Sequence, residues 1–127
     1  MYAESGAFHV NASGKFSLAE AERTFVEMIR EAVQHKVKKI LVDGRNIKGK
    51  PELIERFYFG EFAALTVISH YVESGCSPTF AFVLREPTLD PGRFGETVMV
   101  NRGMQVKVFD NVEEARTWLG IAPTKPH

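Results

Sequence analysis

The chain has 127 residues, of which 44% are hydrophobic and 25% are charged; this is the composition of an ordinary globular domain and excludes disordered and low-complexity proteins. Sixteen basic and sixteen acidic residues give a formal net charge of zero, so the basic surface that nucleic-acid binding requires is not expected. One cysteine excludes an intramolecular disulfide, and four scattered histidines give no metal-ligand spacing, so we expect no metal and no other cofactor.

No repeat, charge block or Pro/Gly-rich linker divides the sequence. We therefore expect one domain over residues 1–127, with a flexible tail over residues 121–127 because prolines stand near the end. The N-terminus lacks the basic flank and apolar core of a signal peptide. The sequence predicts a cytoplasmic protein without a transmembrane segment.

The first half of the chain alternates between strand and helix. Residues 7–12 predict a strand, and Ser17 predicts the N-cap of a helix because Glu20 stands three residues later, as in a capping box. Residues 37–43 end in a compact apolar run that is typical of an interior parallel strand. A loop over residues 44–50 is expected to follow.

The second half repeats the pattern. Pro51 suits the first turn of a helix that runs to about residue 74, and residues 79–85 predict the next strand. Asp90-Pro91 opens a third helix, residues 105–109 predict a last strand, and Asp110 predicts the cap of a short helix. The alternation predicts an α/β fold with one mostly parallel four- to five-stranded sheet and about four helices.

The last helix is expected to turn its charged residues outward and its aromatic residue inward. Glu113, Glu114 and Arg116 fall on the predicted outer side. Trp118 is then expected to pack against the sheet or a neighbouring helix.

The second helix, residues 51–74, is apolar on most of its surface. A period of 100° per residue places one broad apolar face toward the core, formed by Leu53, Ile54, Phe57, Ala64, Leu65, Ile68, Tyr71 and Val72. Phe59 and Phe62 then fall on the polar side, and Glu61 falls within the apolar side. Two interpretations stay open. In the first, a register change at Gly60 restores the pattern, or Glu61 points past the edge of the sheet. In the second, Phe59 and Phe62 form an interface while Glu61 borders a cavity or is paired. The second interpretation predicts a homodimer through this helix.

Charged and polar residues stand where two predicted parallel strands end, which is where open α/β sheets bind ligands. Asp43, Arg45 and Asn46 follow one strand, and Arg85 follows the next. Together they suit an anionic small molecule, with the N-terminus of the next helix adding backbone donors. The alternative is that Asp43 hydrogen-bonds the following loop and Arg45 is solvated.

Four segments carry a resemblance to a known family: ILVDGRNIKG (40–49), RFYFGEFA (56–63), FGETVMVNRG (94–103) and VKVFDNVEEARTWLG (106–120). In these segments the chain resembles STAS-like domains of the SpoIIAA-like (STAS/Sec14-like) type, particularly their bacterial branch. The resemblance implies the SpoIIAA/STAS-like fold. It also implies a small cytoplasmic binding or regulatory module without catalysis, of a kind for which apolar or nucleotide ligands have been proposed.

Two departures from the family pattern matter. Anti-sigma-factor antagonists of this family carry a phosphorylatable serine at the start of a helix after a central strand, whereas residues 43–51 contain no serine or threonine. A phosphorylation switch is therefore not implied for this chain. Relatives also have a further N-terminal strand, which is expected to be short or missing because only about six residues precede residue 7.

Three hypotheses of function remain. The resemblance favours a non-enzymatic binding or regulatory module with a protein partner. The apolar second helix and ten phenylalanines favour a carrier of a lipid or other apolar small molecule. An enzyme is the least favoured, and it would have to use Glu61, Asp43 or Arg45 because the sequence offers no catalytic nucleophile with an arranged base.

Overall fold

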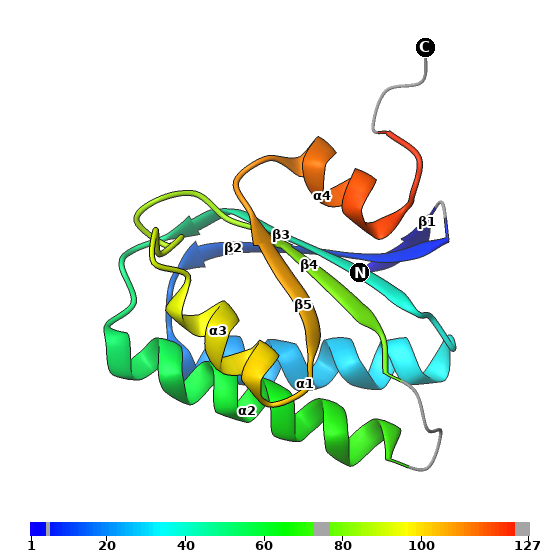
Figure 1. The fold of residues 1–127 in the computed structure, drawn as a ribbon, viewed down its shortest axis with the longest axis horizontal. Helices are drawn as coiled ribbons and strands as arrows, with labels where there is room; N and C mark the ends of the chain where they lie inside the picture. The colour runs from blue at the N-terminus through cyan, green and yellow to red at the C-terminus, as the bar shows by residue number, and fades with distance from the viewer. Residues whose placement is uncertain (5, 73–76, 124–127) are drawn as a thin grey trace.

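A computed structural model describes residues 1–4, 6–72 and 77–123, in which five strands form one sheet (Figure 1). The strand order is β1-β2-β3-β4-β5; β1 pairs antiparallel with β2, and the other neighbours are parallel. The strands are β1 (Tyr2–Glu4), β2 (Ala7–Lys15), β3 (Lys39–Lys48), β4 (Thr79–Val83) and β5 (Gln105–Phe109). The predicted fold class, a mostly parallel sheet with about four helices, is confirmed.

The helices lie on the two faces of this sheet in unequal numbers. Three of them, α1 (Leu18–Gln34), α2 (Leu53–Tyr71) and α3 (Phe94–Asn101), lie on one face, and α4 (Val112–Leu119) lies on the other (Figure 1). Strand residues alternate between two buried clusters. Ile40 and Val42 pack on the three-helix side, whereas Leu41 packs with Ala115 and Leu119 on the α4 side. Both faces of the sheet are therefore covered, as its apolar strands require.

β3 is longer than the sequence predicts. The segment that reads as a loop after Asp43 continues as strand to Lys48, because Asn46, Ile47 and Lys48 pair with the end of β2. A register shift between Asn11 and Ser13 lets this pairing resume. The glycines and lysines of the segment suggest a loop, but pairing with a neighbouring strand overrides that local preference.

The short N-terminal strand forms. β1 has three residues and pairs with β2 from Tyr2↔His9 to Glu4↔Ala7. Near the other end, the cap of α4 is not the predicted Asp110 but Asn111, whose side chain accepts a 3.0 Å hydrogen bond from the Glu114 amide.

The first helix begins where the sequence predicts, whereas the second and third helices begin later. Ser17 caps α1 as expected, with its hydroxyl accepting from the Glu20 amide at 3.4 Å. α2 begins after Glu52 rather than at Pro51. The third helix begins at Phe94, later than predicted, because the residues before it form a turn around the Asp90 carboxylate.

The predicted rotation of α2 about its axis is wrong. The residues buried in α2 are small or β-branched: Gly60, Ala63, Ala64, Thr66 and Val67. Large residues assigned to the core face are exposed instead: Leu53, Ile54, Leu65, Ile68 and Val72. A methyl group at Gly60 would lie 2.9 Å from Val98 Cγ1 and 3.3 Å from the Gly95 carbonyl oxygen, so α2 and α3 approach each other through their smallest side chains.

The predicted orientation of α4 is also wrong in part. Arg116 is buried, whereas Trp118 remains 41% exposed and contacts only the Phe109 ring among the aromatic residues described, at 5.7 Å between centroids. Ile121 packs on the α4-side cluster. The flexible tail stays a prediction, and residues 124–127, like Cys76, lie outside the described residues. Within the described ranges, no helix combines the length and hydropathy needed to cross a membrane.

Candidate functional site

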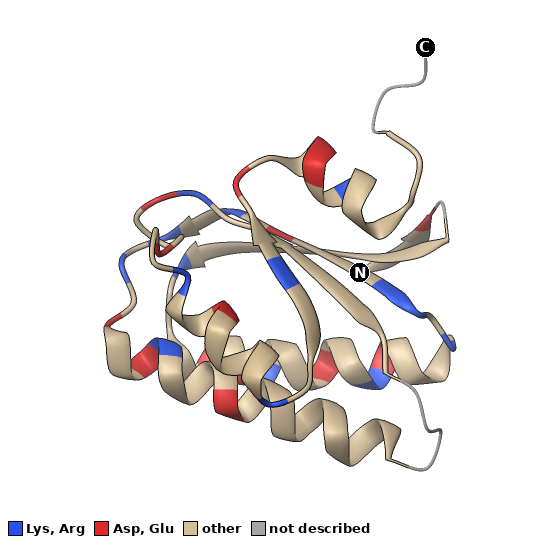
Figure 2. Ribbon diagram, viewed as in Figure 1, with Lys and Arg blue, Asp and Glu red and all other residues tan. Residues whose placement is uncertain are grey.

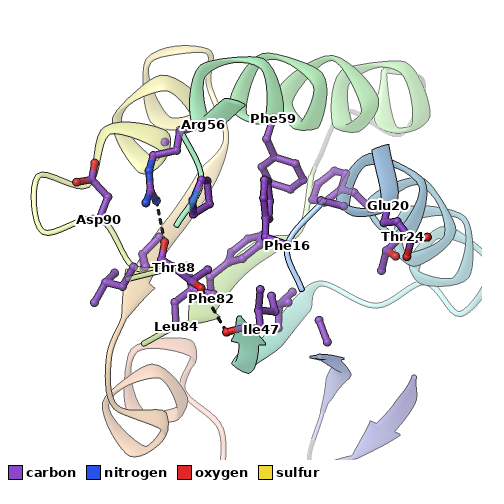
Figure 3. Close-up of a pocket in the computed structure, with 18 of the residues that line it drawn as sticks. Phe16, Glu20, Thr24, Ile47, Arg56, Phe59, Phe82, Leu84, Thr88 and Asp90 are labelled. Carbon is purple, nitrogen blue, oxygen red and sulfur yellow. Dashed lines mark hydrogen bonds between the residues drawn. The ribbon is translucent and has the colours of Figure 1, made fainter. Parts of the chain in front are cut away.

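An apolar cavity of about 230 Å³ lies on the three-helix side, at the carboxyl edge of the parallel strands (Figure 3). Phe59 projects into it from α2, and Phe82 and Leu84 face it from the end of β4 and the segment beyond. Phe16 lies between them in the close-up. Further apolar lining residues are Phe25, Met28, Val42, Ile47, Leu89 and Met99. The cavity stands where ligands of open α/β sheets bind.

Several of the polar groups at the cavity wall form hydrogen bonds with the protein itself. Arg56 donates to the carbonyl oxygens of Thr88 at 2.7 Å and Pro87 at 3.2 Å. The Thr88 hydroxyl donates to the Gly49 carbonyl at 2.8 Å. Arg93 donates to the Val108 carbonyl, and the Val108 amide donates to the Glu96 carboxylate at 2.8 Å. A molecule in this cavity therefore meets mainly apolar surface.

The Asp90 carboxylate holds together the loop between β4 and α3. This carboxylate accepts hydrogen bonds from the amides of Phe94 at 2.9 Å and Gly92 at 3.2 Å. The Phe94 bond is the main reason why the pKa of the Asp90 carboxyl lies below its ordinary value. Asp90 is thus a structural anion that fixes the start of α3.

Asp43 and Arg45, two of the predicted ligand-binding residues, form an ion pair on the opposite face of the sheet. Arg45 Nη2 lies 2.7 Å from Asp43 Oδ2 and Arg45 Nε lies 2.9 Å from Oδ1. The guanidinium hydrogen bond holds the pKa of Asp43 below its usual range, and it raises that of Arg45. The pair lines a second cleft, between α4 and strands β1 to β3.

The structure brings the predicted residues together only in part. Arg85 is exposed, but it is near enough to Asp43 to lower the pKa of that carboxyl electrostatically. Asn46 is exposed and lines neither cavity. Glu61 belongs to the other face, where its carboxylate binds Arg102 in a two-pronged ion pair at 2.7 and 2.9 Å.

The predicted aromatic interface pair is not a pair on the outer surface. The Phe59 ring packs edge-on against Phe25, at 5.7 Å between centroids, and joins the core as well as lining the cavity. Phe62 is half-buried. The premise of two exposed aromatic rings is therefore wrong, whereas self-association through α2 stays a prediction.

Sequence reasoning missed the apolar cavity and the buried members of the second cleft, His9 and Arg116. The cavity is lined from β2, α1, β3, α2, β4, α3 and β5, so no single segment carries a signal for it. The second cleft did have one usable signal in the sequence. If the strand is taken to continue past residue 43, Leu41, Asp43 and Arg45 alternate along it, so that both charged side chains lie on the same face of the sheet.

No protein-family model matches the sequence, and a search of curated proteins gives no match. Among solved structures, the chain is similar to an anti-sigma factor antagonist from Mycobacterium paratuberculosis, with a TM-score of 0.58 and 14% sequence identity over 94% of this chain and 90% of that one. The likeness confirms the SpoIIAA/STAS-like fold that the sequence resemblance implied.

Proposed function

We propose that this protein is a non-enzymatic, cytoplasmic regulatory module of the STAS-like fold that binds a small apolar molecule in the three-helix cavity. The observation that carries the proposal is the cavity itself, whose wall is mainly apolar and several of whose polar neighbours already have protein partners. Ligand sites of proteins are typically concave and mostly apolar, and they are often found at this edge of a sheet.

The volume of the cavity limits the ligand. An engineered apolar cavity of about 150 Å³ takes up benzene or xenon, and pockets for drug-sized ligands begin near about 300 Å³. A cavity of about 230 Å³ therefore suits a molecule of one or two fused rings, or a short alkyl chain. A full-length lipid chain would need a larger space.

The regulatory part of the proposal rests on the fold and on the predicted family. The structural neighbour is described as an anti-sigma factor antagonist, which suggests a protein partner for this chain also. Control by phosphorylation is not proposed, because residues 43–51 have no hydroxyl side chain and the N-cap of α2 is Glu52. Ligand occupancy of the cavity is the proposed signal instead.

Catalysis is disfavoured by the state of the three residues that an enzyme would have to use. Asp43, Arg45 and Glu61 are each engaged in an ion pair. The lowered pKa of Asp43 makes its carboxylate a poor proton acceptor near neutral pH, where general bases work best with a pKa close to the operating value.

Native mass spectrometry of protein purified without detergent tests the proposal. The wild type is expected to carry one small molecule per chain, and Ala21→Phe is expected to lose it because the new ring occupies the cavity that Ala21 lines. Spectra of the two proteins that show the same bare chain would contradict the proposal.

A second proposed function is self-association through the outer stripe of α2, which we define as Ile54, Tyr58, Leu65, Ile68 and Val72. All five side chains are exposed. Glu61, whose carboxylate binds Arg102, lies in the same row between Tyr58 and Leu65. The six positions follow one another at alternating steps of four and three residues, which is the spacing by which paired helices interlock. An apolar patch of this kind on a helix marks an interaction surface.

The proposed occupant of the outer stripe is a second copy of the chain. Residues 62–72 contain no Lys, Arg, Asp or Glu (Figure 2), so two copies meet without like-charge repulsion. An antiparallel pair would also bring the acidic start of α2, with Glu52 and Glu55, toward His70 near the other end, and would oppose the two helix dipoles favourably. Two-fold dimers require such a self-complementary patch.

A further inference from the structure

The second cleft contains a buried arginine that has no acidic partner in the part of the chain that the structure describes. This cleft, of about 600 Å³, lies between α4 and strands β1 to β3, and Arg116 reaches it from α4. Arg116 is 7% exposed, and it is the only buried arginine among residues 1–4, 6–72 and 77–123. Its Nε donates to the Ala122 carbonyl at 2.5 Å. Within the described ranges, its two terminal amino groups have no hydrogen bond and no carboxylate within 4.0 Å.

This arrangement reverses the usual relation between burial and pairing. The arginines that do form ion pairs are more exposed: the side chains of Arg45, Arg102 and Arg23 are 33%, 39% and 64% exposed. An isolated buried charge costs several kcal/mol, so buried arginines are normally neutralised by a carboxylate or by a bound anion. Most of the Arg116 side chain is buried, but its terminal amino groups are not among the fully buried atoms that lack a hydrogen-bond partner, so they stay open to the cleft and accessible to an anion.

The acidic residues that line the cleft do not neutralise the Arg116 guanidinium. Asp43 is already engaged by Arg45 through two short contacts. Glu113, which also lines the cleft, is exposed on α4, and no ion pair within 4.0 Å joins it to Arg116. The stacked rings of Tyr2 and His9, 5.0 Å apart, form a further wall.

We propose that the cleft beneath α4 binds a small oxyanion ligand, a carboxylate or a phosphate, through the guanidinium of Arg116. The planar fork of arginine matches both groups, which accept two parallel N–H bonds. Because its Nε is fixed by Ala122, the guanidinium is oriented before the ligand arrives, so less rotamer freedom is lost on binding. This site is separate from the apolar cavity, which lies on the other face of the sheet.

Titration of the protein with sodium phosphate, and separately with sodium acetate, at constant ionic strength tests the proposal. The Nε–Hε resonance of Arg116 is followed by NMR, and melting temperature is measured at each concentration. Saturable shifts and a rise in melting temperature are expected with at least one of the two anions, and the stronger response tells a phosphate ligand from a carboxylate ligand.

Arg116→Met keeps an unbranched apolar side chain that reaches about as far as Nε, and it removes the guanidinium charge. It is expected to weaken anion binding by about tenfold or more, while the ligand-free melting temperature stays unchanged or rises, because replacing an unpaired buried charge by an apolar group is often neutral or stabilising. Arg30→Met, which removes an exposed positive charge on α1, on the opposite face of the sheet, is the matched control and should bind as the wild type does. Unsaturable wild-type shifts with both anions, or equal binding by Arg116→Met, would overturn the proposal.

Discussion

Val67→Asp is expected to lower the free energy of unfolding by about 3–5 kcal/mol, whereas Ile68→Asp should change it by only about 0.5 kcal/mol. The two residues are neighbours on α2, both β-branched, and differ mainly in exposure: Val67 is 4% exposed and Ile68 is 52% exposed. The aspartate at position 67 is buried beside apolar groups, and the one at position 68 remains in water.

Thermal melts followed by circular dichroism at low micromolar concentration measure this difference. Low concentration matters because dimer formation would stabilise the wild type and not Ile68→Asp. Helix propensity and dipole effects are nearly the same at adjacent positions, so each variant controls for the other. Equal melting temperatures for the two variants would show that the rotation of α2 in the structure is wrong.

Leu65→Glu is expected to convert a dimer to a monomer while the fold stays intact. Leu65 is 61% exposed and lies in the middle of the outer stripe, where a central interface residue contributes about 2 kcal/mol or more, or roughly thirtyfold in the dissociation constant. A glutamate at position 65 faces the apolar stripe of the partner. Because the dimer is two-fold, the partner carries a second glutamate at the same position nearby. The negative charge therefore opposes association twice.

The measurement is sedimentation of both proteins at tens of micromolar. The protein concentration must be this high for a weak dimer to be populated and detected. Val33→Glu, an exposed apolar position on α1, serves as control and should sediment as the wild type does. A wild type that is already monomeric at these concentrations excludes self-association through α2.

The strands and their order of appearance could be predicted because parallel strands are buried on both faces and give continuous apolar runs. Ile40 to Val42 and Phe80 to Val83 are such runs, and each became an interior strand. β3 past Asp43 could not be predicted, since its pairing with residues 13–15 is a long-range interaction that the local glycines and lysines conceal.

The prediction of how α2 is rotated about its axis was wrong for a different physical reason. Its apolar residues surround the helix, so the pattern has no single face, and the largest side chains were assigned to the core. Close packing against α3 instead requires glycine at position 60, because a Cβ there would lie 2.9 Å from Val98 Cγ1. Small residues at spacing three and four, such as Gly60, Ala63, Ala64 and Val67, were the informative pattern.

The residues of the candidate sites could be predicted from the sequence to different degrees, because their contacts depend on tertiary structure. Asp43 and Arg45 were identified from their place after a strand, but their mutual ion pair depended on the continuation of β3. Arg116 stands in a helix whose neighbours Glu113 and Glu114 indicate an outer surface. Its burial follows from the chain after α4, where Ala122 returns to accept its hydrogen bond.

Binding of naphthalene to the wild type and to two variants tests the central claim most directly. Ala21 lines the apolar cavity, whereas Ala19, two residues earlier on α1, is exposed; phenylalanine at each position adds the same ring inside or outside the cavity. NMR titration should show saturable shifts at residues such as Phe59 and Met99 in the wild type and in Ala19→Phe, and binding about tenfold weaker or more in Ala21→Phe. No saturable binding to the wild type, or equal binding by a folded Ala21→Phe, would contradict the assignment of the cavity as a ligand site.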